Sequence, residues 1–267
     1  MSWTRRLDEA RDAYRNRDAR ASALAHDPAR IAQAAEGHGG EASRYVGEVV
    51  YGSLDGIITT FAVVSGVAGA ELGTGVVLIL GLANLFGDGL SMAAGAYLSA
   101  RSDLEYYQRE RAREEWEIEH FPDGERAELE EVYLKMGFSP QDAADLVRIQ
   151  SKDRRLWVDM MMVHELGMLR EDHRPLRAAL TTFAAFAVAG AVPLLVYLAG
   201  LAVDIPADSK FWLSVGSTAV ALFGLGAAKT LVTGVHWLRA GLEMLVVGSL
   251  AAAVAYGIGV ALRGLGV

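Results

Sequence analysis

Five stretches of this sequence are long and apolar enough to cross a lipid bilayer, and they limit what the chain can fold into. They are residues 49–70, 75–100, 176–201, 211–235 and 242–262. A helix needs about 20 apolar residues to cross about 30 Å of hydrocarbon. A chain that is 52% hydrophobic also holds more such runs than one soluble core can bury. The sequence therefore predicts an all-α membrane protein with five transmembrane helices per subunit.

The hydrophilic parts of the chain predict its domain organisation. Residues 1–44 are polar and mixed in charge and lack the apolar run of a signal peptide. The first two spans lie within 45–100, a hydrophilic insert occupies 101–172, and the last three spans lie within 173–267. In the N-terminal segment Trp3, Leu7, Ala10 and Tyr14 recur at helical spacing, which predicts an amphipathic helix.

The distribution of basic residues predicts the orientation of the spans. Residues 1–44 carry eight arginines, whereas the linker 71–74 carries no basic residue. Because cytoplasmic loops are enriched in Lys and Arg, we expect the N-terminus to be cytoplasmic. Alternation of the spans then puts the insert in the cytoplasm as well. The chain has no cysteine, which excludes disulfides and thiolate metal sites.

The insert is strongly acidic. It contains 19 acidic and 11 basic side chains, a net charge of −8 that equals the formal net charge of the whole chain. Its pattern predicts three helices. The first continues from the second span to about His120, the second is capped by Asp123 and runs to about Met136, and the third is capped by Ser139 and has Pro140 at its first position.

Carboxylate and thioether side chains recur one helical turn apart in the insert. The pairs are Glu114 with Glu117 and Glu125 with Glu128, and the third expected helix brings Met161, Met162 and Glu165 together. Unpartnered carboxylates repel one another, so this clustering indicates bound cations. Thioether sulfur favours later divalent ions, which points to Fe²⁺, with Mn²⁺, Co²⁺ and Zn²⁺ as alternatives. Core packing is an equally weighted role for the methionines, and a solvated hairpin is the alternative for the insert.

Polar side chains also occur inside the first two spans. Asp55 is the one charge in the first span, and an ionised side chain there costs about 2.5 kcal/mol or more. Thr59 lies one turn from Asp55, while Asn84, Asp88 and Met92 follow one face of the second span. These five side chains can line a polar path through the membrane. A set of hydrogen bonds between helices is the alternative.

Small residues in the same two spans predict close contacts between helices. Gly52 and Gly56 flank Asp55, and a second line consists of Ala83, Gly87, Ser91, Gly95 and Ser99. Small residues four apart allow helices to approach closely in lipid. In the third span, Pro193 predicts a kink.

Four motifs in this order resemble the vacuolar iron transporter family. They are Tyr51-Gly52-Ser53-Leu54-Asp55-Gly56, residues 84–92 ending in Gly-Leu-Ser-Met, Arg113-Glu114-Glu115-Trp116-Glu117, and Met161-Met162-Val163-His164-Glu165-Leu166-Gly167. The resemblance extends over residues 44–262. It implies a homodimer with five membrane helices per subunit that exports Fe²⁺ or Mn²⁺ from the cytosol, in some members in exchange for protons.

The resemblance also implies roles for individual residues. Asp55 and Met92 match the metal ligands of the translocation path. The cytoplasmic metal ligands of the family match Glu114, Glu117, Glu125, Glu128, Met161, Met162 and Glu165. Many members have a glutamate where this chain has Asn84, and Asp88, one turn along, can supply that charge.

We therefore expect a divalent-metal exporter rather than an enzyme, with protons, membrane lipid and a second copy of the chain as partners and no nucleic acid. The transported metal is the only bound group expected, and a bacterial inner membrane is the expected location. One alternative is a membrane-anchored iron-binding protein or ferroxidase, which Glu117-x-x-His120 suggests; a di-iron bundle needs two such motifs, and the chain has one. A metal-sensing membrane protein is the other alternative.

Overall fold

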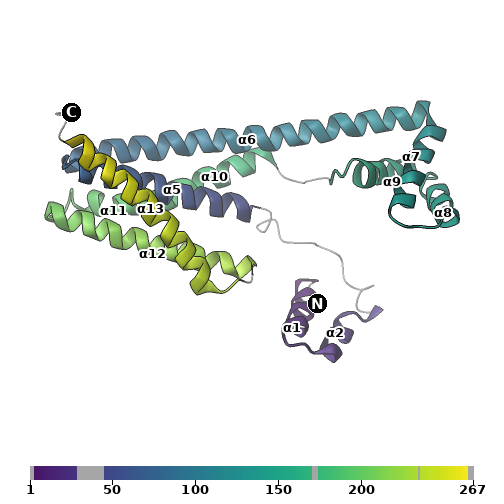
Figure 1. Cartoon of the computed structure of the whole chain (residues 1–267), viewed down its shortest axis with the longest axis horizontal. Coiled ribbons are helices and arrows are strands. Elements are labelled where there is room, and N and C mark those ends of the chain that lie inside the picture. Colours follow the sequence, from purple (N-terminus) through teal and green to yellow (C-terminus); the bar gives the residue numbers. More distant parts are fainter. Residues whose placement is uncertain (1–2, 29–44, 170–173, 234, 264–267) are drawn as a thin grey trace. The chain divides into compact units, whose positions relative to one another are not determined.

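The computed structural model describes residues 3–28, 45–169, 174–233 and 235–263, and all regular elements within them are helices (Figure 1). The chain divides into two compact units, Met1–Gly47 and Glu48–Val267. In the first unit, α1 (Trp3–Arg15) packs against α2 (Ala19–Ala25). The Asp18 carboxylate caps α2 by accepting hydrogen bonds from the backbone N–H groups of Arg20 and Ala21. Residues 29–44 of the expected N-terminal segment lie outside the described residues.

Four helices of the second unit are long and apolar enough to cross a membrane. They are α5 (Val46–Gly69), α6 (Thr74–His120), α12 (Ala207–Thr233) and α13 (Trp237–Arg263). A fifth span results if α10 (Pro175–Gly190) and α11 (Val192–Ala199) form one crossing. The all-helical membrane fold is therefore confirmed, with four or five spans among the described residues.

The third predicted span is bent, as the position of Pro193 predicts. α10 and α11 meet at an angle of 48° around Ala191. Pro193 lies in the first turn of α11, where its missing N–H is tolerated but the helix cannot continue straight. The Ser214 hydroxyl on α12 donates a 2.7 Å hydrogen bond to the Pro193 carbonyl, and α11 packs against α12. A neighbouring helix thus satisfies a backbone acceptor next to the bend, as the bilayer interior demands.

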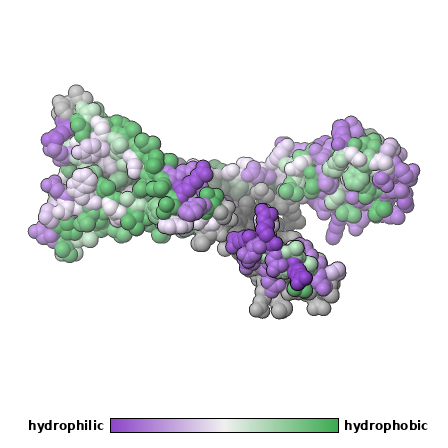
Figure 2. All heavy atoms as spheres, turned by 60° about the horizontal axis from the view of Figure 1, so that its bottom comes forward, coloured by the Kyte–Doolittle hydropathy of each residue, from purple (hydrophilic) through white to green (hydrophobic). Residues whose placement is uncertain are grey.

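Helix α6 extends well beyond the predicted span. Its 47 residues correspond to about 70 Å of helix, more than twice the hydrocarbon thickness. The apolar part ends at Ala100, and charged residues follow from Arg101. Figure 2 shows hydrophobic residues gathered over the membrane helices and many hydrophilic ones over the insert. The insert is therefore carried by the same rigid helix that crosses the membrane.

Helix α10 packs closely against both α5 and α6. A Cβ atom added to Gly52 would lie 2.8 Å from the Thr182 carbonyl oxygen, and one added to Gly56 would lie 2.4 Å from that of Phe186. On α6, a Cβ atom added to Gly89 would lie 3.2 Å from the rings of Phe183 and Phe186. The prediction that Gly52 and Gly56 permit close helix contact is confirmed, since any side chain there would meet backbone atoms.

The small-residue line of α6 has a different environment. Its members Ala83, Gly87, Ser91, Gly95 and Ser99 are all exposed. A Cβ atom at Gly87 or Gly95 would meet nothing within 4 Å among the described residues. The expected close helix contact is therefore not made along this line by a described helix of the same chain.

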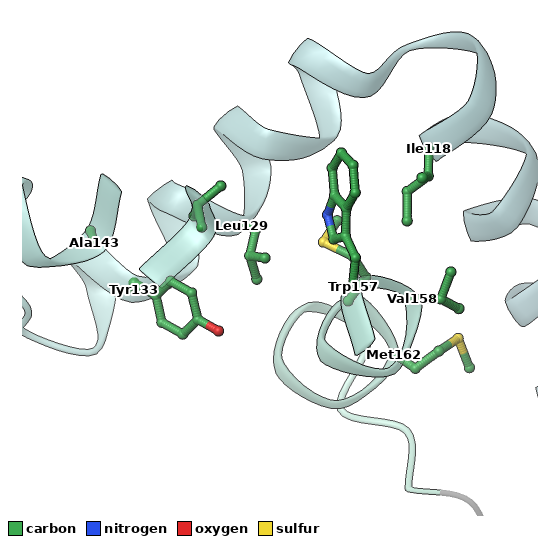
Figure 3. Packing of buried hydrophobic residues seen from close by; sticks show 9 residues of the cluster. Ile118, Leu129, Tyr133, Ala143, Trp157, Val158 and Met162 are labelled. Atoms are coloured by element: carbon green, nitrogen blue, oxygen red, sulfur yellow. The ribbon is translucent and has the colours of Figure 1, made fainter. Parts of the chain in front are cut away.

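The insert continues from α6 through α7 (Pro122–Lys135), α8 (Pro140–Gln150), α9 (Arg154–Met160) and the π-helix η1 (Met161–Glu165). These elements share a hydrophobic core, of which Figure 3 shows the packing. The core consists of Ile118, Leu129, Tyr133, Ala143, Val147, Trp157, Val158, Met161 and Met162. A core of this kind is more than a solvated helical hairpin has, so the helices of the acidic insert pack around a hydrophobic core.

Two details of the predicted insert are wrong. The third helix is interrupted after Gln150, because Asp153 caps a new helix by accepting hydrogen bonds from two following N–H groups, and α9 then ends in η1. The second helix begins at Pro122 rather than after a capping Asp123, whose carboxylate instead accepts a 2.7 Å hydrogen bond from Arg126. The predicted end of α6 at His120 and the Ser139 cap are confirmed.

Candidate metal site

Five glutamates of the insert meet where α6, α7 and η1 come together. Carboxylate oxygens of Glu114, Glu117 and Glu125 lie within 4.8 Å of one another, and so do those of Glu125, Glu128 and Glu165. Each predicted pair lies one turn apart on its own helix, so both members face the same way. Glu125 belongs to both groups, and the fold therefore joins the predicted acids into one cluster.

Two of these carboxylates are buried without full compensation. Glu114 is 1% exposed and Glu125 is 5% exposed. The Oε2 atom of each has no hydrogen-bond partner among the described residues. A buried polar atom without a partner is costly, and a buried carboxylate is more so, because it must be paired or protonated. The cluster is therefore a site that a cation or protons must complete.

Burial shifts the titration of these groups. Burial, reinforced by the neighbouring Glu165, raises the pKa of Glu114 to about 7. Burial and the nearby Glu114 raise the pKa of Glu125 to about 7 as well. The pKa of Glu165 is also raised, first by burial and then by Glu128. Near neutral pH, part of the cluster thus stays protonated.

Ion pairs between elements position the cluster. Arg111 on α6 donates a 2.5 Å hydrogen bond to Asp159 on α9. Arg154 on α9 reaches back to α6, donating to the Glu119 carboxylate at 2.9 Å and to the Glu115 carbonyl at 2.7 Å. These contacts hold α9 against α6, and α9 leads directly into η1, which ends at Glu165.

Arg113 is a member of the cluster that the site prediction left out. Its guanidinium pairs with Glu110 at 3.2 Å, Glu114 at 2.7 Å and Glu117 at 3.0 Å. The spacing of these residues on one helix could have indicated the contacts with Glu110 and Glu117, because side chains three and four positions apart are neighbours.

Met161 and Met162 lie in the hydrophobic core of the insert. Both are fully buried, in the same cluster as Leu129 and Trp157, and Figure 3 shows Met162 beside Val158. Packing is therefore a role that the structure gives both side chains. A further role as metal ligands stays a prediction, although their place in η1, four and three residues before Glu165, fits the frequent occurrence of π-helical turns at functional sites.

His120, the other residue of the Glu117-x-x-His120 motif, points to a different environment. Its ring stacks on that of Trp116 with centroids 4.3 Å apart, and its Nδ1 atom lies 2.8 Å from the Trp116 carbonyl oxygen. His120 is absent from both carboxylate groups found among the described residues. The positions of these side chains do not support a di-iron site at this motif.

Within the membrane, α5 and α6 bring together most of the predicted polar path. The Asn84 amide donates a 3.4 Å hydrogen bond to the Thr59 hydroxyl, which itself donates to the Asp55 carbonyl at 2.8 Å. Asp88 is the charged neighbour of Asp55. Met92 lies one turn beyond Asp88 and is half-buried; its pairing with Asp55 stays a prediction. One hydrogen bond between the two helices therefore exists here, as the alternative interpretation expected. Neither this bond nor the Thr59 bond within α5 involves the side chain of Asp55 or Asp88.

Comparisons with known proteins agree in assigning one family. A family model described as the VIT family matches residues 46–260. The chain is 37% identical over 265 residues to a vacuolar iron transporter of Toxoplasma gondii, covering 96% of this chain and 88% of the relative. It is 34% identical over 262 residues to one of Plasmodium falciparum, covering 96% of both. Vacuolar iron transporter 1 of Arabidopsis thaliana is 35% identical over 217 residues, with 80% of this chain and 85% of the relative covered.

Proposed function

The chain belongs to the VIT family, and from that membership we propose that it exports Fe²⁺ from the cytosol across a membrane in exchange for protons. Relatives that align over most of its length are named vacuolar iron transporters, and the chain is accordingly a metal transporter rather than an enzyme. Mn²⁺ is a second proposed substrate, because both ions accept carboxylate oxygen.

The observation that carries the proposal is the uncompensated cluster of the insert. Glu114 and Glu125 each bury a carboxylate oxygen without a partner, amid three further glutamates. The Arg113 guanidinium pairs with one oxygen of Glu114, and the other oxygen has no hydrogen-bond partner among the described residues. We propose that the insert is cytoplasmic and collects divalent ions with these five acids, with Met161 and Met162 as supporting ligands.

The membrane part supplies the route by which the ion leaves. We propose that it passes from the insert to Asp55 and Met92, along a path that Thr59, Asn84 and Asp88 also line. The shared network of Asp55, Thr59 and Asn84 joins the first two spans along this route. A carboxylate must be deprotonated to bind metal, so proton and metal compete for each acid. Exchange of one for the other across the membrane follows from that competition.

A homodimer fits the exposed face of α6. The small-residue line lies beside Asn84 and Asp88 and is exposed, and a Cβ atom at Gly87 or Gly95 would meet nothing within 4 Å among the described residues. A second copy can therefore approach it closely. We propose that two chains meet along this line and enclose the path between them.

The orientation is also a proposal. The linker 71–73 and the C-terminal end of α13 lie at one end of the membrane helices, joined by an ion pair of Glu71 with Arg263. The insert extends from the other end of α6. We propose that this end faces the cytosol, because the arginine-rich segment precedes α5 in the chain and cytoplasmic segments are enriched in Lys and Arg. We keep a bacterial inner membrane as the proposed location, although the relatives are named as vacuolar.

Transport into sealed vesicles tests the proposal. The protein is reconstituted with a pH-sensitive dye inside, and Fe²⁺ or Mn²⁺ uptake is followed together with the internal pH. We expect Asp55→Asn to abolish both the metal flux and the coupled proton flux. Asp204→Asn, an exposed acid in the loop after α11, is the matched control and should transport normally. Unchanged flux in Asp55→Asn would show that the path is assigned wrongly.

Metal titration tests the insert separately. The double variant Glu114→Gln/Glu117→Gln should bind Mn²⁺ more weakly than the wild type in calorimetry of the purified full chain. Glu131→Gln on α7, which removes an exposed acid paired with Lys135 at 2.8 Å, is the control and should leave affinity and stoichiometry unchanged. Equal binding by the double variant and the wild type would reject the insert as a metal site.

A further inference from the structure

Arg113 occupies the acidic cluster in a way that a metal ion must disturb. Its Nη2 atom lies 2.7 Å from Glu114, its Nη1 atom 3.0 Å from Glu117 and its Nε atom 3.2 Å from Glu110. All three guanidinium nitrogens are thus engaged by carboxylates. Two of these partners, Glu114 and Glu117, belong with Glu125 to one of the two groups whose oxygens converge.

A guanidinium and a divalent ion compete for these oxygens. The guanidinium is permanently charged and has no lone pair to offer a metal, so it can only repel the ion. In the metal-free site it offsets part of the repulsion among the glutamates. A divalent metal that coordinates Glu114 and Glu117 offsets the repulsion among the glutamates with a higher charge. The metal and the guanidinium then repel each other at close range.

The structure allows Arg113 to leave without disturbing the core. Its side chain is 44% exposed, whereas that of Glu114 is 1% exposed. A rotation of the arginine toward solvent therefore breaks ion pairs but no buried packing. The unpartnered Oε2 atoms of Glu114 and Glu125 remain in place as ligands that Arg113 does not block.

We propose that Arg113 is a built-in competitor of the metal, which holds Glu114 and Glu117 in the empty site and is expelled when a divalent ion binds. This inference rests on the proposed function of the insert as a metal site. Arg113 therefore lowers the affinity of the site for the metal, because the free energy of its ion pairs is subtracted from the free energy of metal binding. A site that collects ions for transport must also release them, and Arg113 can pair with the carboxylates again when the ion leaves.

Calorimetric titration of the purified full chain with Mn²⁺ tests this competition. Arg113→Gln should bind Mn²⁺ about tenfold more tightly, the size expected for two partly exposed ion pairs. Arg113→Lys keeps the positive charge but lacks the forked guanidinium contacts, so its affinity for Mn²⁺ should lie between those of the wild type and Arg113→Gln. The matched control is Arg109→Gln, one turn earlier on α6, which removes the same charge but pairs with Glu110 alone among the described acids; its affinity should stay near that of the wild type. Far-UV circular dichroism checks that each variant keeps its helices.

The release of the arginine can be observed directly. Phenylglyoxal modifies accessible guanidinium groups, and peptide mass spectrometry gives the rate at each arginine. Saturating Mn²⁺ should raise the rate at Arg113 severalfold and leave Arg109 unchanged.

Weaker or equal Mn²⁺ binding by Arg113→Gln, or protection of Arg113 by the metal, would overturn the inference and make the residue a positioning group. If the wild type itself binds no Mn²⁺, the proposed metal site fails and this inference fails with it. The two failures are thus distinguished by the wild-type titration alone.

Discussion

Glu114 and Glu125 show how a fold can prepare single residues for a charged substrate. Each is placed by a helix that buries it beside a hydrophobic core, and each keeps one oxygen without a partner. The energetic penalty of such burial falls on the charged form, which explains why the pKa of both groups is raised to about 7. Protons can complete the site when metal is scarce, and metal can complete it when protons leave.

This burial predicts a pH dependence of stability in the metal-free protein. Since the pKa of Glu125 rises from 4.5 to about 7 on folding, the native state retains a proton that the unfolded chain releases between these values. Stability therefore falls as pH rises through that window. Glu125→Gln removes the loss, so its free energy of unfolding should exceed that of the wild type by a margin that grows from pH 5 to pH 8, reaching about 2–3 kcal/mol. The difference in melting temperature between the two proteins should grow in the same way.

The control for this measurement is Glu131→Gln, at an exposed position of the same helix. Pairing with Lys135 lowers the pKa of Glu131, so its replacement should not stabilise the protein as pH rises. A margin for Glu125→Gln that stays constant with pH would contradict the prediction.

At the scale of elements, glycine positions decide which helices can touch. Gly56 on α5 faces the backbone of Phe186 on α10, whereas Gly216 on α12 faces open space among the described residues. The same residue type therefore has opposite roles in two spans, one as a contact point and one as a substitutable position.

Replacing each glycine by alanine should separate the two roles. Gly56→Ala puts a Cβ atom 2.4 Å from a carbonyl oxygen, so the helices must shift, and overpacking of this kind costs about 1–3 kcal/mol. Gly216→Ala should be neutral or stabilising, because alanine has the higher helix propensity. Thermal unfolding of the purified variants in detergent measures both, and a melting temperature for Gly56→Ala at or above that of the wild type would rule out the described packing of α5 on α10.

At the scale of the whole molecule, one surface of α6 stays exposed in the single chain although its residues suit contact with another helix. The small-residue line of α6 is exposed, although such lines are favourable only when another helix lies against them. A two-fold arrangement that pairs this line with its copy would put the same residue of each chain near the axis.

Cross-linking tests this arrangement, and the chain suits it because it has no cysteine. Ser91→Cys and Gly87→Cys, each introduced alone, should form disulfide-linked dimers in oxidised membranes. Val220→Cys on α12, which is 75% exposed but lies on a different helix, should not. Cross-linking of Val220→Cys, with neither α6 variant linked, would place the interface elsewhere.

Much of this protein could be predicted from sequence periodicity and composition. The apolar runs located the membrane helices because crossing a bilayer requires length and hydrophobicity, which are local properties. The end of α6 at His120, the Ser139 cap and the bend at Pro193 also depend on residues close in sequence. The interruption after Gln150 was missed because an Asp153 cap inside a helical pattern competes with continuation of the helix, and packing of Trp157 and Val158 in the core accompanies the new helix.

The sequence by itself determined the helical membrane class and the acidic character of the insert. It also placed the candidate metal ligands at spacings that share a helix face, because residue type and spacing alone decide which side chains do so. Only the tertiary structure decided which faces meet. It joined the glutamates of α6, α7 and η1 through Glu125 and buried Glu114. Burial and charge pairing depend on residues up to about fifty positions apart in the chain, and no local pattern contains that information.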